Sequence, residues 1–516
     1  MPDEKNTQQQ AQAAETVTLA QLFKKGEAAP LIEELKKGRI DALPNAELCR
    51  KQLEPEGHDV MDPLKRRDRW VKTDPTDPNQ NMAEDGEKGD PIADHIVTTR
   101  TAQDGSTWKI ERVARVAVAL QKLIVKRAVA FLFGNPPQLE AEPESAQEEE
   151  ALKDLKRVLR KTKTKTLNRR VAREIFSATE AAELWYAVPD PKGNKLYGFD
   201  SKVKLRSTIF SPLKGDELYP YFDETGDMVA FSRAFSITDA AGTKRDYFET
   251  YTDAATFRWI QKDGNWELLP GFPKKQPLGK IPVIYGRQPE TEWADVQGLI
   301  DRLEKLLSNF AETNDYHASP KIVTKGNIVS FAKKGEAGAV IEMDPDGDAH
   351  YMTWDQAPAA VKLEIETLLR LIYTVTQTPD ISWDSVKGLN VSGVALRLMF
   401  MDAHLKVEDK MEVFGDYLQR RYSVLLAYLK QMNAGNKPFG EACDSLTVEP
   451  VVKPYMLEDE KEKVEILMAA TGQKAIASRK NAVQRLGWAD DVDAEVEAIE
   501  ADDETGVFQD VTEPTL

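Results

Sequence analysis

The feature that most constrains the fold is a polar break between two helical patterns, within residues 372–400. The first pattern stops at Thr378-Pro379, because proline lacks a backbone donor and disfavours helix in the residue before it. Mostly polar residues follow, and Ser392 then offers an N-cap from which the helical spacing restarts. The sequence therefore predicts a loop at 379–392 that is held between two strong helices and presented at a fixed place.

This predicted loop belongs to a wider alternation of helices around a small β segment. Apolar residues at helical spacing predict helices at 291–316 and 357–378, and β-branched runs between them predict a β excursion at 317–356. After the loop, the same spacing predicts one long helix at 393–434, in which Gly415 is a candidate bend point. From Glu458 onward the spacing predicts two or three short helices.

The first half of the chain has a different texture. Residues 1–16 are polar and predict a flexible arm, and one or two short helices are expected at 19–35. A basic amphipathic helix is predicted from 106 to 133, and a helical block from 146 to about 182. Residues 183–285 alternate aromatic and β-branched runs with turn pairs, which predicts one antiparallel β-rich domain. The expected fold class is therefore α+β.

Composition limits the possible functions. The chain has 516 residues, so several domains are expected, and its net charge is -17. Such acidity argues against a protein that coats nucleic acid or an anionic membrane, although it suits a surface that stays close to DNA without holding it. No apolar run is long enough for a transmembrane helix, so no membrane partner is expected. The two cysteines lie far apart, which fits a reducing cytosol.

Catalytic signatures do not occur in the sequence. It contains none of the motifs of phosphate-binding loops, zinc proteases or serine hydrolases, so we expect no enzyme, no cofactor and no metal. The stretch from Asp344 to Asp348 begins like a calcium-binding loop, but Ala349 stands where glycine is needed and Asp355 where glutamate is needed. A hairpin turn is the better interpretation.

The predicted loop carries side chains that can meet a nucleic-acid backbone. Lys387 is the candidate phosphate contact, whereas Trp383 either stacks on a base or, as we favour, packs as an anchor. The candidate loop residues are Ser382, Trp383, Asp384, Ser385, Lys387 and Asn390. A second basic stretch, 153–170, contains nine Lys or Arg and one Asp. It is a solvated helix face or an interface with an acidic subunit in one interpretation, and a nucleic-acid contact in the other.

The order of these elements resembles that of the portal proteins of tailed bacteriophages. The stretch NVSGVAL (390–396) resembles the entry to the long helix of that family. The stretch FLFGNPP with the following block KDLKRVLRKTKTKT is similar to its wing region, and 478–483 and 490–500 resemble its C-terminal pattern. The matches spread over residues 100–500, and their fixed order carries the resemblance.

The resemblance implies a ring, usually of twelve subunits, at one vertex of the virion capsid, assembled in the host cytoplasm. Double-stranded DNA would pass through its channel. Its partners would be the terminase large subunit, which hydrolyses ATP, the major capsid and scaffold proteins, and a head-tail adaptor. The implied parts are an N-terminal arm (1–60), a β-rich wing (61–290), a two-helix stem (291–316 and 357–378), a small α/β clip (317–356), a tunnel loop (379–392), a long kinked wing helix (393–434), a helical crown (435–500) and an acidic tail (501–516).

Two other functions share parts of this pattern. A capsid or head-tail adaptor protein without a DNA channel would have the same acidity and β texture. A DNA-processing enzyme would need a metal or nucleotide site, and the sequence offers none.

Overall fold

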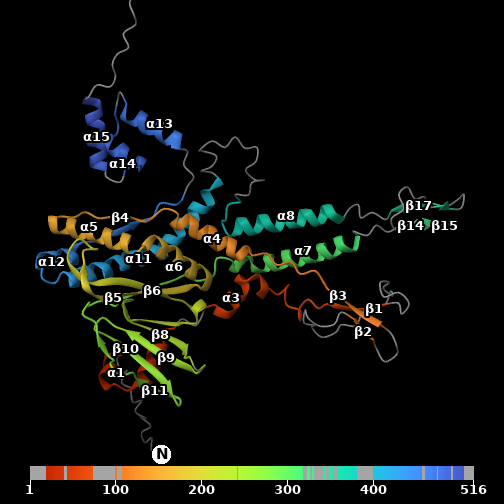
Figure 1. The fold of residues 1–516 in the computed structure, drawn as a ribbon, viewed down its shortest axis with the longest axis horizontal. Helices are drawn as coiled ribbons and strands as arrows, with labels where there is room; N and C mark the ends of the chain where they lie inside the picture. Colours follow the sequence, from red (N-terminus) through yellow and green to blue (C-terminus); the bar gives the residue numbers. More distant parts are fainter. Residues whose placement is uncertain are drawn as a thin grey trace, which may run out of the picture. The chain divides into compact units, whose positions relative to one another are not determined.

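The computed structural model divides the chain into two compact units (Figure 1). The first consists of residues 1–378 and 406–454, and the second of residues 379–405 and 455–516. Helices and strands are mixed in the first unit, in agreement with an α+β class. The structure describes residues 19–39, 43–73, 99–101, 107–240, 242–317, 322–325, 328–330, 342–343, 348–351, 357–380, 399–455, 460–472, 475–489 and 492–504.

The larger sheet of the first unit is antiparallel throughout. Its order is β11-β10-β9-β8-β7, with β12 paired to β10. Its strands are β7 (Glu217–Phe222), β8 (Met228–Thr238), β9 (Lys244–Tyr251), β10 (Ala255–Lys262), β11 (Asn265–Leu268) and β12 (Lys274–Lys275). Helices α1 (Leu19–Lys25) and α2 (Ala28–Lys36) confirm the short helices predicted there. They pack on this sheet, where Leu31 and Leu35 are buried with Tyr219, Phe248 and Trp259.

A second, three-stranded sheet has the order β13-β5-β6. Its strands are β5 (Glu180–Asn194), β6 (Ser201–Phe210) and β13 (Val283–Arg287). The single β-rich domain predicted from the sequence thus contains two sheets, because the apolar strand β13 returns to pair with β5, with Val283 opposite Leu184. The two sheets share one core, since Phe210 and Val283 of the smaller sheet pack with Leu218 and Phe231 of the larger.

One predicted helix is wrong over its first half. Residues 107–111 form β3 (Thr107–Glu111), which pairs with β1 (Arg69–Thr73) and β2 (Thr99–Thr101), and helix α4 spans only Leu120–Phe133. The segment 112–119 has no regular structure. Three of its backbone N–H groups find side-chain partners instead. Val116 and Val118 donate to Ser308 Oγ (2.9 Å) and Glu304 Oε1 (2.8 Å) of helix α7 (Gln297–His317), and Val113 donates to Asp68 (3.0 Å). Satisfied in this way, they have no need of a helical partner.

The helical block predicted at 146–182 is two helices. Helix α5 (Ala146–Lys161) begins after the N-cap Ser145, and α6 (Thr164–Ala178) follows it. Between them Lys163 has a φ of 57°, a left-handed conformation that interrupts a right-handed helix. Helix α6 leads directly into β5.

Two long helices bracket a small β segment, as predicted. A short 3₁₀ turn, η3 (Ala294–Val296), precedes α7, and α8 (Ala357–Val375) lies beside α7 (Figure 1). In the described part of the segment between them, four short strands form two antiparallel pairs. They are β14 (Ile322–Lys325) with β17 (Asp348–Tyr351), and β15 (Ile328–Ser330) with β16 (Glu342–Met343).

The long helix after the predicted loop is α11 (Met401–Met432); its predicted start at 393 lies outside the described residues. The apolar residues whose spacing predicted this helix form its buried side, since Val407, Phe414, Leu418 and Leu425 are each at most 2% exposed. Helix α12 (Lys437–Ser445) then packs on α5, and β18 (Glu449–Val451) pairs with β4 (Gln138–Glu140).

In the second unit, three short helices confirm the prediction for the end of the chain. They are α13 (Glu460–Thr471), α14 (Arg479–Leu486) and α15 (Val492–Glu504), and α14 contacts both of the others. Ser478 caps the start of α14 by accepting the Asn481 N–H at 3.2 Å. Among the helices that the structure describes, none is long and apolar enough to span a bilayer.

Candidate functional site

The six candidate residues of the predicted loop, Ser382, Trp383, Asp384, Ser385, Lys387 and Asn390, lie outside the described residues. The structure does describe the end of α8 that leads into this loop, the helix α11 that follows it and the residues that fasten them. These flanking parts form the frame of the loop, and their geometry is the candidate functional site.

The end of α8 is fixed by its own threonines. Thr376 Oγ1 donates to the Ile372 carbonyl at 2.7 Å, and the Thr378 N–H donates to the Tyr373 carbonyl at 2.9 Å. Between them Gln377 adopts a left-handed φ of 49°, which ends the helix, and Pro379 excludes its continuation. Both threonines are buried. The predicted stop at Thr378-Pro379 is therefore confirmed.

An ionic cluster joins this helix end to the helix on the other side of the loop. We call Glu292, Thr376, Lys406 and Lys410 the Lys406 node. The Lys406 ammonium of α11 donates to the Thr376 carbonyl at 2.9 Å and lies 2.5 Å from Glu292. Lys410 lies 3.0 Å from the other carboxylate oxygen of Glu292, off the line of a hydrogen bond. A cation is also favourable at the carboxyl end of a helix, where the backbone carbonyls are unpaired.

The carboxylate of Glu292 is buried, so it requires cationic partners. The side chains of Glu292 and Lys406 are 3% and 10% exposed. Burial raises the pKa of Glu292, but the charges of Lys406 and Lys410 outweigh it and hold that pKa below its usual value. Glu292 also donates its backbone N–H to the Phe176 carbonyl at the end of α6. The approach to α7, the end of α8 and the first turns of α11 are thus held at one point.

A second buried cluster, the Arg421 clamp, fixes α11 to the smaller sheet. Arg421 of α11 binds Glu183 of β5 with two parallel hydrogen bonds of 2.8 and 2.6 Å, and its third nitrogen donates to Asn168 of α6. Tyr417 and Trp185 also donate to Glu183. Arg421 and Glu183 are at most 1% exposed. This bidentate geometry satisfies both oxygens of the carboxylate, so a buried charge pair is tolerated here.

The close approach of Tyr417 depends on a glycine. Gly286 of β13 lies beneath the Tyr417 ring, and a Cβ at this position would stand 2.8 Å from the ring carbon. Any larger residue would push the ring away, and with it the hydroxyl that donates to Glu183.

The N-terminal part of the first unit is fastened to α7 through a buried histidine. His58 follows α3 (Ala46–Leu53) and the turn η1 (Pro55–Gly57); its Nδ1 lies 2.6 Å from Glu304 and its Nε2 lies 2.8 Å from the Gln52 carbonyl. Both partners are acceptors, so both ring nitrogens must carry protons. Burial lowers the pKa of His58, but the bond and charge of Glu304 outweigh it and raise the pKa above its usual value.

A buried carboxyl group stands at the turn from α6 into β5. Glu180 is 1% exposed, and the Tyr285 hydroxyl donates to it at 2.8 Å. Burial raises the pKa of Glu180 to about 7, although this hydrogen bond and the charges of Arg39 and Arg287 act in the opposite direction. Glu180 is thus largely neutral below pH 7 in the folded protein.

Glu180 should make the protein less stable as pH rises. The carboxyl binds its proton up to about pH 7 when folded but only to about pH 4.5 in the unfolded chain, so its stabilising effect is complete below pH 4.5 and is lost as pH passes 7. The loss amounts to about 3 kcal/mol. Glu180→Gln should remove it and be more stable than the wild type at pH 8, as measured by urea denaturation between pH 5 and 8.

Two other side chains sharpen this experiment. His58 has a raised pKa as well, so its contribution is lost in the same direction, above pH 6.5, and remains in Glu180→Gln. Tyr285→Phe removes a bond that lowers the pKa of Glu180, and should therefore shift the loss of stability to higher pH. A Glu180→Gln protein with the wild-type slope between pH 5 and 6.5 would show that Glu180 does not hold the proton.

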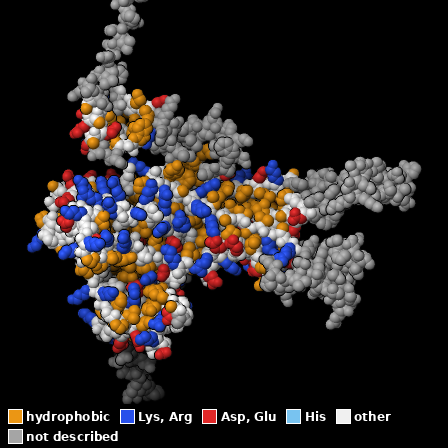
Figure 2. Space-filling view, viewed as in Figure 1, with side chains coloured by type: hydrophobic (Ala, Val, Ile, Leu, Met, Phe, Trp, Pro, Cys, Tyr) orange, Lys and Arg blue, Asp and Glu red, His pale blue; other side chains and the backbone are white. Residues whose placement is uncertain are grey.

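Helix α8 also carries an exposed apolar stripe. Leu363, Leu371 and Val375 stand on one side of the helix and are 65%, 42% and 50% exposed. Figure 2 shows hydrophobic side chains gathered over α7 and α8. Arg302 of α7 binds Glu364 of α8 at 2.6 Å and ties the two helices together. The pair is thus held together within the subunit while one side of it remains uncovered.

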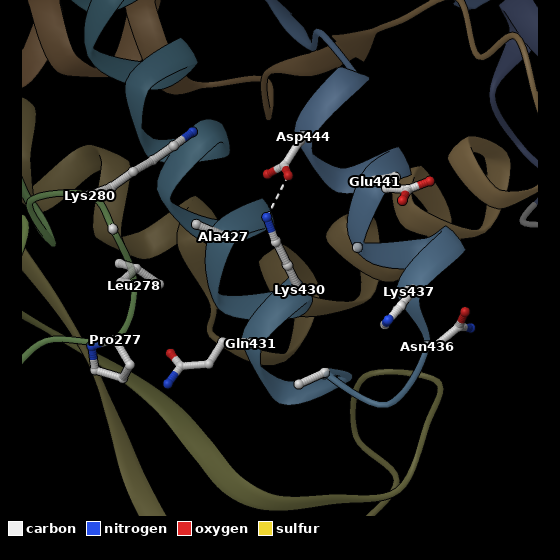
Figure 3. A pocket seen from close by; sticks show the side chains of 13 residues that line it. Pro277, Leu278, Lys280, Ala427, Lys430, Gln431, Asn436, Lys437, Glu441 and Asp444 are labelled. Carbon is white, nitrogen blue, oxygen red and sulfur yellow. Dashed lines mark hydrogen bonds and ion pairs between the residues drawn. The ribbon is translucent and has the colours of Figure 1, made fainter.

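A crevice of about 670 Å³ with a mixed polar and apolar lining lies between the end of α11, the start of α12 and residues 277–280 (Figure 3). Lys430 faces Asp444 there at 2.5 Å, and Lys280 donates to Ser423 at 2.6 Å. Because these cations are already held within the chain, we interpret the crevice as the seam between α11 and α12. We assign it no ligand.

The described part of the chain offers no group of three or more His, Cys, Asp or Glu side chains placed to hold a metal ion. The buried ionic clusters connect structural elements, and their residues do not line the crevice between α11 and α12. The ion pairs of the Lys406 node join the two helices that flank the predicted loop.

Comparison with known proteins bears on what the loop is for. A family model described as phage portal protein, SPP1 Gp6-like, matches residues 95–507. Among solved structures, a chain from the virion of a native gene transfer agent (GTA) particle is 11% identical, with a TM-score of 0.34, and the match covers 72% of this chain and 88% of that chain. No curated protein matches.

Proposed function

The chain belongs to the phage portal protein family of the SPP1 Gp6-like type, a structural family and not one of enzymes, and on that premise we propose that it forms a closed ring at one vertex of a phage capsid. Double-stranded DNA passes through this ring during packaging and ejection. We propose twelve subunits per ring. The protein is a component of the virion and assembles in the host cytoplasm.

The observation that carries this proposal is the frame of the loop. The Lys406 node fixes the end of α8 and the first turns of α11, so the loop between them can be held at a constant position in every subunit. A loop repeated around a ring forms a collar, in which weak contacts from Lys387 and its polar neighbours add up. The net charge of -17 suits such a channel, because strong cationic contacts would stop DNA from moving.

The apolar stripe on α8 supports the ring itself. A pair of helices that leaves Leu363, Leu371 and Val375 exposed needs a partner surface, and the same pair in the next subunit can supply it. Contacts of this head-to-tail kind close into a ring when the rotation between subunits fits.

We assign the parts of the chain accordingly. The wing is 61–290, the stem is formed by α7 and α8, and the clip is the β segment between them. Residues 379–392 are the DNA-facing tunnel loop, in which Ser382, Asp384, Ser385, Lys387 and Asn390 face DNA and Trp383 anchors the loop. The crown is 435–500, of which residues from 455 onward belong to the separate second unit. The clip docks the terminase large subunit and later a head-tail adaptor, and the wing contacts the major capsid and scaffold proteins.

Electron microscopy of the purified protein tests the proposal. We expect closed rings with a central hole of about the width of a DNA duplex. Monomers or flat lattices would contradict it and favour the second candidate, a capsid or head-tail adaptor protein without a channel. The triple variant Leu363→Asp, Leu371→Asp, Val375→Asp places charge on the exposed stripe and should leave the subunit folded but prevent rings.

A further inference from the structure

The basic stretch noted in the sequence forms one continuous surface in the structure. Helix α5 turns Lys153, Lys156, Arg157, Arg160 and Lys161 to solvent, at positions that share one side of a helix, and buries Ala151, Leu155 and Val158 on the other. Lys163, Lys165, Arg170 and Arg173 continue this exposed surface along α6. Figure 2 shows Lys and Arg side chains gathered over these two helices. We call these nine residues the basic face.

The cations of the basic face form almost no ion pairs with the described residues, although the exposed Glu149 and Glu150 lie one turn before Lys153 on α5. In α5, α6 and the turn between them, which the structure describes completely, Arg157 is paired with Asp154 at 2.7 Å. For the other eight cations no ion pair is formed with the described residues. Arg169, the remaining arginine here, points inward to the Phe133 and Gly134 carbonyls and is not part of the face. The chain as a whole has a net charge of -17, so a surface of unpaired cations is unusual in it and indicates an anionic partner.

The composition of the face favours nucleic acid over protein. No large apolar side chain of α5 or α6 is exposed, so the face lacks the buried anchors from which protein interfaces gain most of their affinity. Exposed lysine and arginine side chains suit phosphate oxygens instead. From Lys153 to Lys161 the helix rises about 12 Å, a length over which a DNA duplex carries roughly seven phosphate charges.

We propose that the basic face binds the phosphate backbone of double-stranded DNA, without sequence preference and independently of the tunnel loop. The contact does not require DNA to lie inside a ring. It gives the protein a second DNA-binding surface with the opposite character of the first: the loop lets DNA slide, whereas the basic face holds it.

A duplex that cannot be threaded separates this contact from the channel. The full-length protein is titrated against a labelled, covalently closed DNA minicircle and against linear DNA of the same sequence, at several salt concentrations. We expect both to bind, with an affinity that falls steeply as salt rises. Binding of the linear duplex alone would place the contact in the channel and overturn the proposal.

Charge removal tests the residues. The triple variant Lys153→Gln, Lys156→Gln, Arg160→Gln should weaken minicircle binding roughly tenfold or more and make the slope of log K against log salt shallower by about 2 to 3. The matched control Lys192→Gln, Lys202→Gln, Lys275→Gln removes the same charge from exposed positions outside the face and should bind as the wild type does. Equal binding by the two variants would overturn the proposal.

The remaining alternative is an acidic protein partner. To test it, poly-glutamate and unlabelled DNA compete with the bound minicircle, and their concentrations are compared per negative charge. Displacement by poly-glutamate at the lower concentration would favour a protein partner and contradict the proposal. Ring formation is scored separately by electron microscopy for each variant, so this test does not depend on the portal assignment. If the protein forms no rings but the basic face binds DNA, the inference still holds.

Discussion

Replacing Arg421 with methionine should lower the free energy of unfolding by roughly 3 to 5 kcal/mol, more than any other single charge removal that we consider. The substitution leaves Glu183 charged and fully buried, with only the Tyr417 and Trp185 donors. It also leaves the side-chain oxygen of Asn168 without its arginine donor. Urea denaturation followed by circular dichroism measures the change.

The geometry of the clamp supplies the control. Arg421→Met together with Glu183→Gln removes the stranded charge, so the double variant should recover part of the lost stability, since a buried ion pair replaced by neutral groups costs little. Arg245→Met makes the same substitution at a pair that is 53% and 32% exposed, and should change stability only slightly. If Arg421→Met unfolds no more easily than Arg245→Met, the clamp does not stabilise α11 on the sheet.

The sequence predicted elements well where local pattern decides them. Helical spacing located α7, α8 and α11, and the Thr378-Pro379 pair located the end of α8. It failed where a distant element decides, as at 112–119. There Val116 and Val118 directly precede helix α4 in the chain, but their N–H groups donate to residues of α7, nearly two hundred positions away. Periodicity contains no information about such partners.

The frame of the loop was missed for a similar reason, although a signal was present. Lys406 and Lys410 lie one turn apart on a long helix, beside the buried stripe that begins at Val407. Two cations next to an apolar stripe indicate a buried acidic partner, because an unpaired charge is costly there. Arg421, three residues after the buried Leu418, gives the same signal. The identity of the partners, Glu292 and Glu183, required the structure.

Replacing residues 382–390 with a Gly/Ser segment of equal length should abolish DNA-filled heads while leaving rings intact. The Lys406 node and the threonines of α8 lie outside the replaced segment, so the flanking helices keep their anchors. The equal length preserves closure of the loop. The measurements are electron microscopy of the purified variant and the DNA content of heads formed when it replaces the wild-type protein in assembly. A Gly/Ser replacement of the five residues of the hairpin turn 223–227 is the control and should preserve packaging.

Single substitutions show whether the loss of packaging comes from a misplaced loop or from a lost contact with DNA. If Lys387 meets phosphates, Lys387→Ala should reduce the DNA retained in heads but not ring stability, and the reduction should be largest at low salt, where an electrostatic contact is strongest. If Trp383 anchors the loop, Trp383→Ala should lower ring stability as well as packaging, because an anchor positions every side chain of the loop. Loss of rings in the Gly/Ser variant would contradict the proposed role and make the loop part of the subunit interface. A contact between subunits and a contact with DNA would then be distinguished by whether stability depends on protein concentration.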